Sequence, residues 1–126
     1  MIEAAQVFAI LVFGLTGLSH LLAPRVWADF FARAAADGER GSLTNAAIHL
    51  PLGLVIAAFH PVWTWPGIVL TLMGWSLVAK SALYMCFPRF GAAALARGGS
   101  HPASAYQAGG VFSLAVAAFV AWLRFA

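Results

Sequence analysis

Four long runs of apolar residues, separated by short polar segments, dominate the chain. The runs cover residues 6–23, 46–62, 66–86 and 104–123, and each is close to the ~20 residues that a helix needs to cross the hydrocarbon core of a bilayer. Hydrophobic residues make up 63% of the sequence and charged residues 9%, whereas a soluble domain carries about 25% charged residues. We therefore predict an all-α integral membrane protein, with residues 1–126 forming one transmembrane domain, a bundle of four membrane-spanning helices.

The polar segment after the first run has a helical pattern of its own. Three bulky residues, Trp27, Phe30 and Phe31, fall on one helical face. Charges of alternating sign recur every fourth residue on the opposite face, at Arg25, Asp29, Arg33 and Asp37. We predict one interfacial amphipathic helix here, whose apolar face is a membrane anchor or a surface for a partner. The corresponding segment 87–97 is shorter and runs into two glycines, so we expect any helix there to end early.

The two halves of the chain match each other. Pro24-Arg25 closes the first run and Pro88-Arg89 closes the third, and an Ala-Ala-Phe triplet ends both the second and the fourth. Residues 6–62 and 66–123 are therefore interpreted as two tandem helical hairpins of the same orientation, a parallel internal repeat. A chance match between two apolar hairpins is the alternative. Three side chains are expected to cap the second run, namely Ser42, Thr44 and Asn45.

The formal net charge of +3 is informative mainly through its distribution. Five arginines lie in the first and third connections: Arg25, Arg33, Arg40, Arg89 and Arg97. The positive-inside rule then makes the loops 24–44 and 87–103 cytoplasmic and puts both termini outside, as expected in a bacterial inner membrane. The first run has no basic segment before it and is expected to be retained rather than cleaved. Scattered arginines of this kind do not make a nucleic-acid-binding surface.

Polar side chains within the apolar runs are the candidates for a site. Lys80 lies about six residues before the inner end of the third run, roughly 9 Å deep, where a charge costs about 2–3 kcal/mol. His20 and His49 fall at a similar depth. We predict a polar pocket in the inner half of the bundle for an anionic or polar headgroup, lined by His20, Asn45, His49, Lys80, Tyr84 and Gln107. The alternative for Lys80 is that its stem follows the helix and its ammonium reaches the lipid headgroups.

The two histidines at this depth also raise the question of a metal or haem. Two axial haem ligands would come from adjacent helices at one level, as His20 and His49 do. No Asp, Glu or Cys at that depth completes a metal shell, and Cys86 is the single cysteine. We therefore predict no metal site and no cofactor, with haem held by His20 and His49 as the alternative.

Three functions remain open from the sequence. Because no nucleophile lies beside a base and no paired carboxylates occur in the runs, we favour a non-catalytic membrane protein. It would be an accessory subunit or a binder of a lipid-like or quinone-like ligand. The alternatives are a small transporter or channel assembled as an oligomer, and a haem-binding redox protein. The expected partners are the bilayer, a second copy of the chain, or a larger membrane protein, because glycines recur where helices would touch.

Overall fold

The computed structural model describes residues 1–98 and 101–126, and all regular structure in those residues is helical. Four helices are long and apolar enough to cross a membrane: α1 (Ile2–Leu22), α3 (Glu39–Phe59), α4 (Ile68–Cys86) and α6 (Ala103–Phe125). Two shorter helices connect them, α2 (Pro24–Ala36) and α5 (Pro88–Gly98). The prediction of four long apolar helices is therefore confirmed.

Two details of the predicted elements were wrong. The structure contains a second short helix, α5, where the sequence led us to expect only one, α2. In addition, α3 begins at Glu39, well before the apolar run, and has no side-chain cap. Ser42 instead donates its hydroxyl to the carbonyl of Tyr84 on α4, at 2.9 Å. Ser42 therefore links α3 to α4 and does not cap the start of α3.

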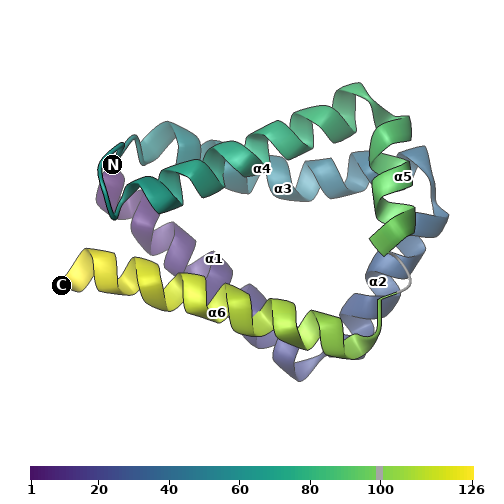
Figure 1. Ribbon diagram of the computed structural model, residues 1–126, viewed down its shortest axis with the longest axis horizontal. Helices are drawn as coiled ribbons and strands as arrows, with labels where there is room; N and C mark the ends of the chain where they lie inside the picture. The colour runs from purple at the N-terminus through teal and green to yellow at the C-terminus, as the bar shows by residue number, and fades with distance from the viewer. Residues whose placement is uncertain (99–100) are drawn as a thin grey trace.

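The four long helices are arranged as two pairs. The helix α1 packs along α6, and α3 packs along α4. The pairs meet at one end of the molecule and diverge toward the other, where α2 and α5 lie between them (Figure 1). Both termini and the loop 60–67 lie at the end where the pairs meet, which we call the narrow end; the opposite end is the wide end. The closest partners are thus first with fourth and second with third, and the tandem repeat stays a prediction.

Glycines allow the close approach within each pair. A Cβ atom added to Gly17 of α1 would lie 2.8 Å from the carbonyl oxygen of Gly110 on α6. In the other pair, a Cβ atom on Gly53 of α3 would lie 2.8 Å from the backbone nitrogen of Val78 on α4. Backbones this close exclude any side chain, which is the way small residues promote helix association in membranes.

The narrow end contains the hydrophobic core and a buried polar cluster. The fully buried core residues Ala9, Ile56, Leu70 and Val120 come from all four long helices. Beside them, the Thr71 hydroxyl contacts the carbonyls of His60 at 2.7 Å and Val62 at 2.8 Å, to one of which it donates its single proton. These hydrogen bonds hold the loop that joins α3 to α4 against α4.

The ring of His60 completes the narrow-end cluster. Because the Thr71 proton goes to a carbonyl, Thr71 Oγ1 accepts from Val62 N–H at 3.2 Å and from His60 Nδ1–H at 3.0 Å. His60 Nε2 then accepts from the Gln6 amide at 3.3 Å. His60 is 0% exposed, and burial lowers its pKa below the ordinary value of 6.5. Both ring nitrogens have partners, so this histidine is structural.

Candidate functional site

A cavity of 430 Å³ opens at the wide end between α1, α2, α3 and α6. We call it the wide-end pocket. Its apolar lining comes from Val26, Trp27, Phe30, Phe31, Ile48 and Leu52, and its polar lining from Thr16, His20, Asn45, His49 and Ser113. Gly109 of α6 also lines it and meets no atom within 4 Å of an added Cβ, so the backbone of α6 faces open space here. Three of the six residues predicted for the site therefore share one cavity.

His20 and His49 are held in the same way. His20 Nδ1 lies 2.8 Å from the carbonyl oxygen of Thr16, and His49 Nδ1 lies 2.8 Å from that of Asn45, each one turn earlier on its own helix. A carbonyl oxygen only accepts, so each Nδ1 carries a proton and donates it. In the neutral ring Nε2 then carries a lone pair. Neither Nε2 has a hydrogen-bond partner among the described residues.

Asn45 adds a buried polar side chain to the lining of the pocket. Its side chain is 4% exposed, and its Oδ1 atom is buried with no partner in the part of the chain that the structure describes. A buried amide oxygen without a donor is unfavourable by about 1–3 kcal/mol. This oxygen is shielded inside the protein, so Asn45 lines the cavity with the rest of its side chain.

Aromatic rings form one wall of the wide-end pocket. Trp27 of α2 stacks on His20 with ring centroids 4.2 Å apart and an interplanar angle of 15°, and its indole N–H donates to Ser19 at 2.9 Å. Phe31 stacks on Tyr106 of α6 at 5.6 Å and 16°. The face of α2 for which we expected lipid or a partner is thus partly used within the molecule. Phe30 remains 39% exposed.

The other three predicted site residues lie outside the wide-end pocket. Lys80 lines a second, largely apolar cavity of 540 Å³ between α1, α4 and α6, together with Phe13 and Phe112. Its Nζ atom lies 5.3 Å from the ring centroid of Tyr84, one turn nearer the wide end. Gln107 is exposed on α6. The sequence indicates a similar depth for Lys80 and the two histidines, but their side chains line different cavities.

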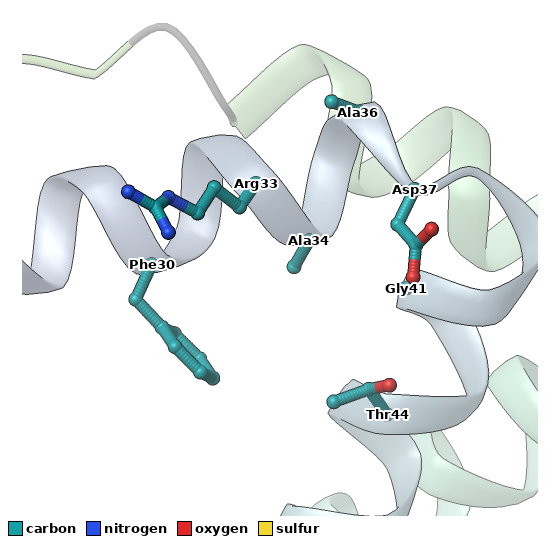
Figure 2. Close-up of a pocket in the computed structure, with 7 residues that line it drawn as sticks. All are labelled: Phe30, Arg33, Ala34, Ala36, Asp37, Gly41 and Thr44. Atoms are coloured by element: carbon teal, nitrogen blue, oxygen red, sulfur yellow. The ribbon is translucent and has the colours of Figure 1, made fainter.

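A separate hollow lies on the surface where α2 turns into α3. Figure 2 shows Phe30, Ala34 and Thr44 around it, with Arg33 and Asp37 at its margin. Arg33 is already paired with Asp29 at 3.0 Å, and both side chains are mostly exposed. Gly41 packs against the backbone of Ala34, where a side chain would collide. The hollow is therefore the outer side of a tight helix–helix turn, and the wide-end pocket is the better candidate site.

Charge and metal ligands are sparse around the wide-end pocket. Arg33 and Arg89 pair with Asp29 and Glu39 on the surface, and Arg124 pairs with Glu3 at the narrow end. None of the described residues that line the pocket is an Asp, Glu, Lys or Arg. Within residues 1–98 and 101–126 there is also no group of three or more His, Cys, Asp or Glu side chains that could hold a metal ion. The pocket offers rings and neutral polar groups, of which the Thr16 hydroxyl and the Asn45 amide can donate as well as accept.

No protein-family model, curated protein or solved structure matches this chain. The geometry of the wide-end pocket is therefore the basis on which its function is inferred.

Proposed function

We propose that this protein is a non-catalytic membrane protein that binds a lipid-like or quinone-like ligand in the wide-end pocket. One observation carries the proposal: an apolar, aromatic-walled cavity is lined by His20 and His49, each with an Nε2 atom that has no partner among the described residues, and by the polar side chains of Thr16 and Asn45. Its volume of 430 Å³ falls within the range of about 300–1,000 Å³ found for small-molecule sites. A few polar atoms in an apolar pocket suit a molecule with one polar headgroup and an apolar tail.

The surroundings of the pocket favour a ligand that arrives from the bilayer. The exposed surface of the long helices is rich in large apolar side chains, among them Leu11, Leu15 and Leu18 on α1 and Ile48 and Leu54 on α3. Lipid tails would cover these surfaces on both sides of the pocket. A ligand dissolved in the leaflet could then enter between α1 and α3 without crossing water. An accessory role in a larger membrane complex is compatible with this mode of binding.

We further propose that the protein lies in a bacterial inner membrane with its wide end toward the cytoplasm. The helices α2 and α5 and the start of α3, which together hold five arginines, lie at the wide end. Both termini and the loop 60–67, which holds Trp63 and Trp65, share the narrow end. The positive-inside rule then puts the termini outside. A reporter that is active only outside the membrane should therefore be active when fused to either terminus, and a reporter that is active only in the cytoplasm should be silent there. The reverse result would overturn this orientation.

Native mass spectrometry of the protein released gently from its own membrane tests the binding proposal. We expect a retained small molecule, lost in the double variant His20→Phe/His49→Phe and kept in Lys80→Met, which alters the other cavity. Both variants must keep the helical circular dichroism of the parent. A protein without any bound molecule, or a bound molecule that the double variant retains, would overturn the proposal.

A further inference from the structure

The second cavity, which we call the Lys80 groove, is built differently from the wide-end pocket. On α4 it is lined by residues at the spacing of one helical face, namely Val69, Leu72, Met73, Ser76, Leu77 and Lys80. Phe13 of α1 and Phe112 of α6 form the other side. Among these residues only Lys80 is charged, and it is the one nearest the wide end. The groove is therefore apolar along its length, with a cation at one end.

The groove exists because α4 packs mainly against other helices. Its principal contacts are with α3 and α5, and it makes few with α1 or α6. The two helix pairs also diverge toward the wide end, which separates α4 from α6 there (Figure 1). At the margin of the groove Leu72 and Phe112 are 50% and 66% exposed. In a bilayer lipid tails would fill this open space, because the hydrocarbon core holds no water to do so.

Lys80 forms no ion pair among the described residues. Three of the four acidic side chains in the sequence pair with arginines, and the fourth, Asp37, follows the end of α2. The Lys80 ammonium lies 5.3 Å from the ring centroid of Tyr84, which attracts a cation without neutralising it. A charge inside a membrane-spanning segment is unfavourable unless it is paired. An anion in the groove would provide the missing partner.

The length of the groove matches the tail of a lipid. From Val69 to Lys80 it follows α4 for about 16 Å at 1.5 Å per residue. One leaflet contributes about 15 Å to a hydrocarbon core of ~30 Å, so the groove is about as long as an acyl chain in its leaflet. A lysine stem can extend along its helix toward the headgroups. The ammonium and a lipid phosphate would then meet at the wide end of the groove.

We propose that the Lys80 groove binds an anionic phospholipid from the leaflet at the wide end, with the phosphate against Lys80 and one acyl chain along α4. The groove prefers a lipid of net negative charge over a zwitterionic one. The inference goes beyond the proposed function: it rests on the proposed membrane location but not on the ligand of the wide-end pocket, with which the groove shares no lining residue.

Photo-crosslinking inside a bilayer tests this inference, because a lipid in an open groove exchanges with its leaflet and is not expected to survive release. The protein is placed in phosphatidylcholine nanodiscs that contain a trace of phosphatidylglycerol or phosphatidylcholine, each with the same photoreactive acyl chain. Labelled residues are identified by peptide mass spectrometry. Trp75 is the internal reference, since it is 50% exposed on α4 and does not line the groove.

We expect the phosphatidylglycerol probe to label Leu72, Met73 and Phe112 about 5-fold more than the phosphatidylcholine probe does, relative to Trp75. One basic residue near a membrane surface contributes about that factor to the binding of anionic lipid. Equal labelling by the two probes would overturn the inference. A fatty acid with the same photoreactive chain that labels the groove more strongly than phosphatidylglycerol would overturn the phospholipid as the occupant.

Variants of single cations assign the preference to Lys80. Lys80→Met removes the charge and should abolish the excess labelling by phosphatidylglycerol, whereas Lys80→Arg should keep it. Arg97→Gln removes an exposed arginine of α5 and should leave the labelling of the groove unchanged. All variants must keep the helical circular dichroism of the parent. Labelling of Lys80→Met like that of the parent, or an equal loss in Arg97→Gln, would overturn the role of Lys80.

A variant that fills the groove tests the place of the acyl chain. The Ser76 hydroxyl donates to the carbonyl of Leu72 in its own helix at 2.7 Å, so Ser76→Phe fills the groove without breaking a hydrogen bond between helices. It should lower labelling of the groove by both probes. Ala82→Phe adds the same ring at an exposed position outside the groove and should have no effect. An equal effect of the two substitutions would contradict the placement.

Labelling of Trp75 reports membrane insertion independently of the groove. If both probes label Trp75 and neither labels the groove, protein fills the groove and the inference is overturned, while the membrane location stands. If neither probe labels Trp75, the membrane location fails as well. The wide-end pocket has its own test in the variant His20→Phe/His49→Phe, whose residues lie outside the groove.

Discussion

His49 within α3 and His60 immediately after it lie toward opposite ends of the molecule, and the two rings have opposite surroundings. At the narrow end, His60 just after α3 has a partner on each ring nitrogen, Thr71 and Gln6. Toward the wide end, His49 has a partner on Nδ1 only and lines a cavity. Both nitrogens of the His60 ring are hydrogen-bonded within the protein, whereas the Nε2 atom of His49 has no partner among the described residues.

The difference shows how a polar group inside an apolar protein can be assigned a role. Where all hydrogen bonds are made internally, removing one partner leaves others unpaired and the fold loses stability. Where an acceptor already lacks a partner, replacing it by an apolar group removes an unfavourable term. Variants at the narrow end should therefore affect stability, and variants at the wide end should affect ligand affinity.

The largest loss of stability is expected from Thr71→Val at the narrow end. The substitution leaves His60 Nδ1–H and a carbonyl without Thr71, whereas Val62 N–H keeps the carbonyl of His60 at 2.9 Å. Each unpaired group costs about 1–3 kcal/mol, so we expect a loss of about 2 kcal/mol or more in the free energy of unfolding, measured by denaturant titration in mixed micelles. Thr44→Val is the control, because Thr44 is exposed and bonds only to Arg40 of its own helix. A similar loss in both variants would contradict the assigned role of Thr71.

Adding one methyl group should give opposite results at two glycines. In Gly53→Ala the new Cβ would lie 2.8 Å from the backbone of α4, and overpacking of this kind costs about 1–3 kcal/mol. In Gly109→Ala nothing lies within 4 Å of the Cβ, and alanine favours a helix over glycine by about 1 kcal/mol. The thermal midpoint should thus fall in the first variant and hold or rise in the second. Equal midpoints would mean that α3 and α4 approach less closely.

Acid should weaken the fold through the narrow end. Burial lowers the pKa of His60 below 6.5, so the unfolded chain binds its proton at a higher pH than the folded chain does. The contribution of neutral His60 is complete above about pH 6.5 and is lost as the pH falls from there through the lower folded-state pKa. We expect the free energy of unfolding to decline over that window, and His60→Gln to reduce the decline. An unchanged slope in His60→Gln would assign the acid sensitivity to another group.

The smallest change in stability is expected at Asn45. Replacing it by Leu removes a buried oxygen that has no partner, so the ligand-free protein should be unchanged or more stable by about 1 kcal/mol. The thermal midpoint of the empty protein gives the measurement. A marked loss of stability in Asn45→Leu would show that the amide belongs to the fold, and the contrast between the two ends would disappear.

The long helices were predictable because length and hydropathy alone decide which segments can cross a membrane. Their pairing was not, because all four helices have a similar mean hydropathy, between 1.5 and 1.8, which does not distinguish one partner from another. The close backbone contacts of Gly17 with Gly110 and of Gly53 with Val78 accompany the pairing, but a glycine in a sequence does not indicate which helix it will contact. Which helices contact one another could therefore be learned only from the structure.

Part of the site was predictable for a similar reason. Depth along a helix is one coordinate, and it led us to expect His20 and His49 at one level; both line the same cavity. The direction in which each helix turns its side chains is a second coordinate, and it puts Lys80 in a different cavity. Trp27 was expected at a surface because its helix is amphipathic, yet its ring lies on His20. Hydrophobic periodicity locates an apolar face without saying what that face meets.

The pairing of α1 with α6 sets an order of assembly. The helices α3 and α4 are neighbours in the sequence and can associate as soon as both are inserted, whereas α1 has its main partner at the far end of the chain. Contacts between distant segments form late, because the intervening chain must be in place first. With the proposed membrane location, α1 would be inserted before its main partner exists, and Gly17 would stay unpacked until α6 follows. Gly109 and Ser113 of α6 line the wide-end pocket, so the proposed ligand site would be complete only once α6 is in place.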